Sequence, residues 1–137
     1  MSEYRLLKGM EAITPEAAQT LLKQAYWATN RPLEVIRRSM EHSMCYGVFS
    51  DKDQKLVAFA RVMTDYAVTY YICDVIVDES HRGLGLSRMI MDAIESAPET
   101  SGLRGILATR DAHGLYAKYG FVPGGVTFMQ KLAKKAH

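Results

Sequence analysis

Cysteine is scarce in this sequence. Its two cysteines, Cys45 and Cys73, lie in apolar, strand-like runs, and neither belongs to a CxxC or Cys/His pattern. Without such spacing the sequence offers no disulfide framework and no cysteine-based metal centre. We therefore expect both thiols to be reduced, buried and structural, and we predict no metal site.

Long apolar runs are also missing. No segment approaches the roughly 20 apolar residues of a membrane-spanning helix. The N-terminal "MSEYRLLKGMEAITPEAA" lacks the basic region and apolar core of a signal peptide. These two absences predict a cytoplasmic protein that has no membrane partner.

The sequence also lacks a large excess of positive or negative charge. The 17 Lys and Arg residues face 15 Asp and Glu residues, which leaves a net charge of +2. A nucleic-acid-binding protein would be expected to carry a clustered basic face. We therefore expect no nucleic-acid partner, although the small positive excess could help to attract an anionic ligand.

The sequence is otherwise that of an ordinary globular chain. It has 137 residues, 48% of them hydrophobic and 23% charged, without repeats, linkers or low-complexity segments. This length is close to the commonest size of one domain and is sufficient to bury a core. We expect a single domain over residues 1–137.

The hydrophobic pattern predicts an α+β fold with a mixed, mostly antiparallel central sheet flanked by helices. Three strands follow one another before the first crossover, which excludes a doubly wound α/β fold, and residues 69–78 and 103–109 should be parallel neighbours. Thr14 and Pro15 mark the start of the first helix. The expected strands are 4–9, 44–51, 55–65, 68–78, 103–110 and a final strand or hairpin over 121–132; the expected helices are 15–28, 33–43, 83–97 and 112–120.

A glycine-rich corner, "RGLGLS" at residues 82–87, connects a buried strand to a helix. Glycines allow a ligand to approach the backbone, and a helix start favours phosphate. A P-loop needs four residues between its glycines and then Lys and Ser/Thr, but only Leu84 separates Gly83 from Gly85. A dinucleotide site needs a third glycine where Arg88 stands. Both of these phosphate sites are excluded.

The same corner resembles motif A of the Gcn5-related N-acetyltransferases (GNAT), which reads Arg or Gln, two residues, Gly, one residue, Gly or Ala. About thirty residues later, "LYAKYGF" is similar to the Leu-Tyr-x-Lys-x-Gly-Phe segment of that superfamily. The resemblance covers nearly the whole chain in element order, and residues 72–123 in motif detail. It implies a small GNAT protein.

The resemblance implies acetyl-CoA as cofactor. The backbone of the corner would wrap the pyrophosphate, and the backbone of Ile76 and Val77 would pair with the pantetheine amides. Ser87 departs from the Gly or Ala of the motif, and Thr109 stands where many relatives carry a cofactor-binding Asn. The cofactor-binding residues expected on this basis are Ile76, Val77, Arg82, Gly83, Leu84, Gly85, Leu86, Ser87, Thr109, His113 and Tyr116.

Direct acetyl transfer needs a proton to leave the amine and a proton to reach the thiolate. The resemblance assigns the second task to Tyr116, which could instead be a packing residue. Asp74 is a carboxylate in an apolar strand, where it needs a partner or a function. It is either the general base, an amine-binding group or a hydrogen-bonded structural residue. His113 and water are the other proton routes.

In this family the region between the first two helices forms a wall of the acceptor site. That position makes Tyr26, Trp27 and Arg31 candidate acceptor-binding residues, although plain packing would also explain them. The expected activity is N-acetylation of a small-molecule or peptide amine. A non-catalytic acyl-CoA-binding module on the same fold is the alternative. A homodimer is compatible with the sequence, which does not determine the oligomeric state.

Overall fold

Five strands form one sheet, in the order β1-β2-β3-β4-β5, in the computed structural model, which describes residues 3–125 and 128–134. Neighbouring strands from β1 to β4 are antiparallel, whereas β4 and β5 are parallel. The mixed sheet and the parallel pair confirm the predicted α+β class. The strands are β1 Tyr4–Lys8, β2 Met44–Ser50, β3 Lys55–Thr64, β4 Thr69–Val77 and β5 Arg104–Ile106.

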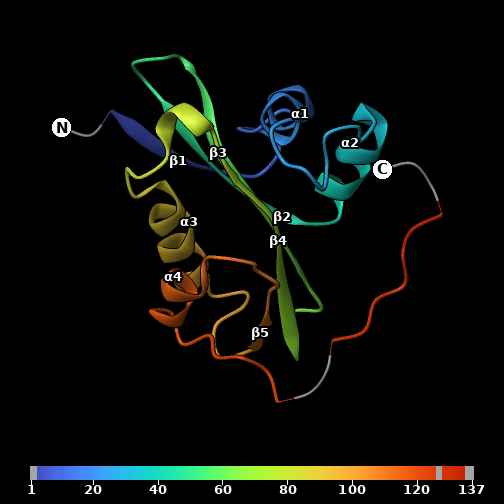
Figure 1. The fold of residues 1–137 in the computed structure, drawn as a ribbon. Helices are drawn as coiled ribbons and strands as arrows, with labels where there is room; N and C mark the ends of the chain where they lie inside the picture. The colour runs from blue at the N-terminus through green and yellow to red at the C-terminus, as the bar shows by residue number, and fades with distance from the viewer. Residues whose placement is uncertain (1–2, 126–127, 135–137) are drawn as a thin grey trace.

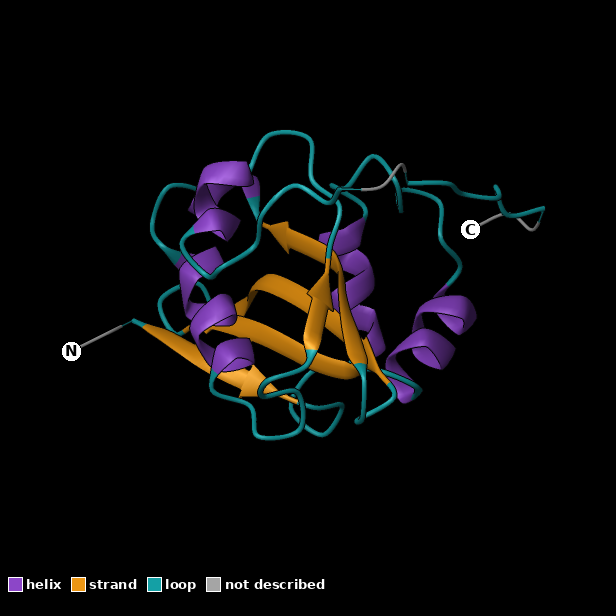
Figure 2. Cartoon of the chain, turned by 90° about the horizontal axis from the view of Figure 1, so that it is seen from below, coloured by secondary structure: helices purple, strands orange, loops and turns teal. Residues whose placement is uncertain are grey.

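Helices cover both faces of the sheet (Figures 1 and 2). Helices α1 (Pro15–Leu22) and α2 (Leu33–Glu41) lie on one face, and α3 (Leu86–Glu95) and α4 (His113–Ala117) lie on the other. Each face has its own buried apolar cluster, because side chains alternate along a strand. Burying both faces explains why β2, β3 and β4 are predominantly apolar.

Helix α1 starts as predicted but ends earlier. The side chain of Thr14 accepts a hydrogen bond from the backbone N–H of Ala17 at 3.1 Å, which is the expected N-cap. The helix stops at Leu22 rather than at residue 28, and tight turns follow it. Ala25 and Ala28 remain buried within these turns, so their apolar spacing was correct although the helix was not.

Other predicted elements also differ from the structure, and helix α4 ends at Ala117 rather than at residue 120. Helix α3 begins at Leu86, not at residue 83, because Gly83 and Gly85 take positive φ angles of 78° and 83°. Strand β5 spans only Arg104–Ile106 of the predicted 103–110. Residues 121–125 and 128–132 of the predicted final strand are not in a strand, and residues 126–127 lie outside the described part of the chain.

A β-bulge interrupts β4 at Asp74. Phe59 of β3 pairs with Ile76 and Arg61 pairs with Cys73, so two residues of β4 lie opposite one residue of β3. Asp74 has a φ of 55°, in the left-handed region that aspartate tolerates better than most residues. A bulge bends its strand, and β5 pairs only with Thr69–Tyr71 before the two strands separate.

Candidate active site

A cleft of about 840 Å³ opens where β4 and β5 separate. Residues 71–77 of β4 form one side, and residues 107–112 after β5, with Tyr116 of α4, form the other. Residues of the glycine-rich loop over 82–87, together with Tyr26 and Trp27, also line the cleft. The short pairing of β4 with β5 therefore creates a ligand-sized space inside the sheet.

The glycine-rich loop has open space above its backbone. A Cβ added to Gly83 or Gly85 would meet no atom within 4 Å. Gly85 directly precedes α3, whose first N–H groups have no partner within the helix. Leu86 is 2% exposed, so this residue offers the cleft its backbone rather than its side chain. The geometry suits an anionic group that approaches the backbone.

His81 holds the segment before this loop, residues 78–81, in place. Its Nδ1 lies 2.9 Å from the hydroxyl of Tyr4 on β1, and its Nε2 lies 2.7 Å from a carboxylate oxygen of Asp53. Asp78, in turn, accepts a hydrogen bond from the N–H of Ser80 at 2.9 Å. His81 is 7% exposed and lines the cleft. These contacts connect the segment before the glycines to β1 and to the turn between β2 and β3.

Asp74 is surrounded by three donors. Arg31 Nη1 and Arg61 Nε each donate to Oδ2 at 2.7 Å, and Trp27 Nε1 donates to Oδ1 at 3.1 Å. Burial alone would raise the pKa of Asp74, but the charges and hydrogen bonds of the two guanidinium groups outweigh burial and lower it. Asp74 is therefore ionised at neutral pH and is a weak proton acceptor. This favours a structural role over general-base catalysis.

Tyr116 lines the cleft from α4. Its side chain is 8% exposed, and its ring packs edge-on against Phe121 with 6.2 Å between ring centroids. Burial, and then the nearby charge of Asp111, raise the pKa of Tyr116 above its usual value of 10.0. The phenol consequently keeps its proton at neutral pH and can donate it.

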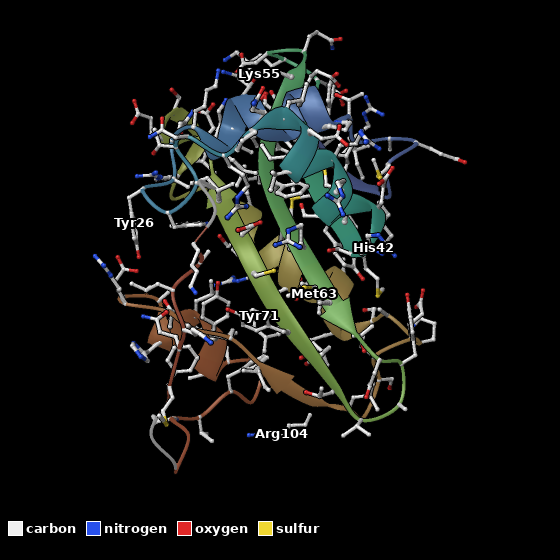
Figure 3. All side chains as sticks on the ribbon, turned by 90° about the vertical axis from the view of Figure 1, so that its right-hand side faces the viewer. Tyr26, His42, Lys55, Met63, Tyr71 and Arg104 are labelled. Carbon is white, nitrogen blue, oxygen red and sulfur yellow. The ribbon has the colours of Figure 1, made fainter. Side chains whose placement is uncertain are left out.

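Aromatic side chains from the connection between α1 and α2 border the cleft. Tyr26 and Trp27 pack edge to face with 5.0 Å between ring centroids, and the guanidinium of Arg110 lies 4.5 Å from the centre of the Tyr26 ring. Figure 3 shows the face of the sheet on which α1 and α2 lie, and these helices leave one end of that face uncovered. Tyr71 lies on that uncovered end, and Tyr26 lies at its edge.

Sequence comparison decides the family to which this architecture belongs. Residues 10–121 match the model of the acetyltransferase (GNAT) family. The chain belongs to this family. The resemblance noted in the glycine-rich corner and in "LYAKYGF" is thereby confirmed, and acyl transfer is the chemistry common to the family.

Individual relatives agree with this assignment. An uncharacterised N-acetyltransferase, ycf52, of Porphyra purpurea is 29% identical over 106 residues, which are 72% of this GNAT chain and 61% of the relative. The chain thus spans about three fifths of that relative's length. A crystal structure of a GNAT-family protein from Xanthomonas campestris pv. campestris is 39% identical, with a TM-score of 0.85 over 97% of this chain and 95% of the other.

A more distant structure shows how widely the fold is used. Glucosamine-6-phosphate N-acetyltransferase from Arabidopsis thaliana superposes with a TM-score of 0.73 over 96% of this chain and the whole of that chain, at 16% identity. This likeness shows the GNAT fold alone. Within the described residues, no helix of this GNAT chain is both long and apolar enough to cross a membrane.

The structure brings most of the predicted site residues to the same cleft, but not all of them. Leu84 is 58% exposed on the loop and His113 is exposed at the start of α4; neither lines this cleft. Thr109 lines it, but its hydroxyl accepts a hydrogen bond from the N–H of Ala112. Arg31 does not line the cleft, but it donates a hydrogen bond to Asp74, which does. The remaining predicted residues line the cleft: Tyr26, Trp27, Asp74, Ile76, Val77, Arg82, Gly83, Gly85, Leu86, Ser87 and Tyr116.

Several residues in the cleft, and Arg61 next to it, were missed from the sequence. Arg61 is a charge in the apolar run "LVAFARVM", as Asp74 is in "YYICDVIV", and two opposite charges in adjacent strands are a signal for an ion pair. Cys73 was expected to be buried, but it is half-buried and lines the cleft. Burial raises the pKa of its thiol to about 11, so Cys73 is no nucleophile at neutral pH. Tyr71, His81 and Arg110 carried no signal in the sequence.

Proposed function

We propose that this chain is an N-acetyltransferase that transfers the acetyl group of acetyl-CoA directly to a primary amine. The observation that carries the proposal is the cleft between β4 and β5, which the glycine-rich loop, Tyr116 and the aromatic residues Tyr26 and Trp27 all border. The cleft thus combines a backbone that suits an anion, a proton donor, and an aromatic border for the acceptor. We call this border, formed by Tyr26 and Trp27, the acceptor wall. Family membership supports the same chemistry.

Residues of the cleft fit coenzyme A. The backbone between Arg82 and Ser87 can hold a pyrophosphate, because Gly83 and Gly85 leave the approach open. The cleft continues along Ile76 and Val77, where β4 has no pairing with β5. The carbonyl of Val77 accepts a weak hydrogen bond from Arg82 Nε at 3.3 Å, which bound cofactor would compete with. When bound, the cofactor supplies an acetyl thioester.

Transfer forms a bond between the amine nitrogen and the acetyl carbon and breaks the bond between that carbon and sulfur. The amine loses one proton and the departing thiolate gains one. Tyr116 donates the second proton, since burial keeps its phenol protonated. Asp74, held by Arg31 and Arg61, keeps Trp27 in place at the acceptor wall, and the amine proton passes to water.

Two measurements test the proposal. Acetyl-CoA should raise the melting temperature, because ligand at about 100 times its dissociation constant adds about 2.7 kcal/mol of stability, whereas ATP and NAD at equal concentration should not. Acetyl-CoA should also release thiol in the presence of a primary amine. Equal stabilisation by ATP would contradict the cofactor assignment. Tight acetyl-CoA binding without thiol release on any amine would identify an acyl-CoA-binding module instead of an enzyme.

A further inference from the structure

Arginine side chains dominate the charge at the acceptor wall. Arg31 and Arg61 lie beneath it, with side chains 14% and 12% exposed, and Arg110 lies at its rim over Tyr26. Among the described residues that line the cleft, the carboxylates are Asp74 and Asp111. This arginine cluster, Arg31, Arg61 and Arg110, carries one positive charge more than these two carboxylates can balance.

The buried carboxylate cannot attract an ammonium group. Asp74 already accepts from Arg31, Arg61 and Trp27, at 2.7, 2.7 and 3.1 Å. A cation that displaced one guanidinium would separate a partly buried arginine from the carboxylate that it binds, which is unfavourable. Asp111 also lines the cleft, but it is exposed, so solvent weakens its attraction for a cation. The acceptor wall consequently disfavours polycations such as polyamines and aminoglycosides.

We propose that the acceptor is an amine that carries a carboxylate close to its amino group, as an amino acid does. This inference rests on the proposed function and names its substrate class. Arg110 binds the carboxylate at the rim, and the arginine cluster supplies a favourable field. Tyr26, Trp27 and Tyr71 contact the remainder of the acceptor, because all three line the cleft.

The arrangement orients the reaction as well as selecting the substrate. A carboxylate held at Arg110 fixes one end of the acceptor, and the adjacent amine is directed into the cleft between β4 and the segment after β5. Its nitrogen then bonds to the acetyl carbon while the thiolate leaves with a proton from Tyr116. Hydrogen bonds between charged groups are among the stronger ones in proteins, so losing the carboxylate should weaken kcat/KM by about 10- to 100-fold.

Matched acceptors test this proposal. Tyrosine and tyramine differ only by the carboxylate, and spermidine serves as a polycation. We expect kcat/KM for tyrosine to exceed that for tyramine by at least about tenfold, and spermidine to be the poorest of the three. Because the two amines differ in basicity, the decisive quantity is the tyrosine-to-tyramine ratio in Arg110→Gln, which should fall towards one. Arg104→Gln removes an exposed arginine of β5 that does not line this cleft, and it should keep the parental ratio.

The outcomes separate this inference from the proposed function. If tyramine or spermidine is preferred, or if Arg110→Gln keeps the parental ratio, the carboxylate site is wrong although the enzyme is an acetyltransferase. If no amine is acetylated, calorimetric titration of tyrosine and tyramine into the coenzyme A complex still decides the inference. Tighter binding of tyrosine supports the carboxylate site, and equal or absent binding overturns it. Failure to bind acetyl-CoA at all contradicts the proposed function itself.

Discussion

Asp74 of β4 and Arg61 of β3 form an ion pair, with 2.7 Å between Asp74 Oδ2 and Arg61 Nε, directly beside the bulge that bends β4. Asp74 therefore connects the bulge of β4 to the acceptor wall, because its carboxylate also accepts hydrogen bonds from Arg31 and Trp27. Asp74 thus holds two arginines and a tryptophan at the point where the cleft begins.

Asp74→Asn tests this structural role. The substitution keeps the shape but removes the carboxylate charge that two partly buried guanidinium groups bind, so we expect the free energy of unfolding to fall by about 3–5 kcal/mol. The pKa of Asp74 is lowered by folding, so its contribution to stability is present above the unfolded pKa of about 3.9 and is lost as pH falls through the lower folded pKa.

Chemical denaturation at several pH values measures the free energy of unfolding of the parent and of Asp74→Asn. The difference in stability between the parent and Asp74→Asn should be constant near neutrality and should shrink only below about pH 4. The acidic limb of the pH-rate profile should survive in the variant. A limb that vanished with the carboxylate, in a folded variant, would return Asp74 to the role of general base.

Tyr116→Phe tests the proton donor. Removing the hydroxyl should lower kcat by about 10- to 1000-fold and leave acetyl-CoA binding intact, because the proton is needed only as the thiolate leaves. A thiolate with a conjugate-acid pKa near 8.5 leaves fairly well unaided, which limits the loss.

The pH dependence of the parent adds a second readout. Since burial raises the pKa of Tyr116, a basic limb due to this phenol should lie above pH 10 in the parent and be absent in the variant. Tyr66→Phe, at an exposed tyrosine in the turn between β3 and β4, serves as the control and should keep the parental rate. Parental turnover by Tyr116→Phe would make Tyr116 a packing residue.

Gly85→Val tests the phosphate-binding loop. Valine at a φ of 83° is strained, so we expect a loss of stability of about 1–3 kcal/mol, and its branched side chain would occupy the space above the backbone. The Michaelis constant for acetyl-CoA should rise much more than it does in Gly102→Val. Gly102 has a φ of 78° and no atom within 4 Å of an added Cβ, but it lies outside this cleft. Equal effects in the two variants would mean that strain, not ligand contact, is responsible.

His81→Phe tests whether residues 78–81 position the glycine-rich loop that follows them. Loss of the imidazole removes the hydrogen bond with Tyr4 and the contact with Asp53, whose side chain is 40% exposed, so each loss should cost only about 0.5–1.5 kcal/mol. We expect a higher Michaelis constant for acetyl-CoA with little change in kcat, because Tyr116 and the acceptor wall are untouched. His81→Gln, which can form part of these hydrogen bonds, should recover part of the affinity. An unchanged Michaelis constant in His81→Phe would limit His81 to core packing.

Local chemistry explains what could be predicted from the sequence. Thr14 and Pro15 specify the start of a helix through a cap and a fixed φ, and these signals act within a few residues. Gly83 and Gly85 indicated a turn whose backbone a ligand could approach, and their positive φ angles show why glycine is favoured at these two positions. Predominantly apolar runs rich in β-branched and aromatic residues indicated the strands β2, β3 and β4, because a strand buried on both faces needs apolar side chains at successive positions.

Only the tertiary structure decided how the acceptor end of the cleft is built. Arg31 and Arg61 lie 43 and 13 positions from Asp74 in the chain, and no local signal pairs them. The bulge at Asp74 arises from the register between β3 and β4, and the early end of β5 arises from the separation that follows. The two neighbouring guanidinium groups lower the pKa of Asp74, which favours a charged anchor over a general base. Proton affinity depends on neighbours in space, and these neighbours are set by the packing of strands rather than by the order of residues.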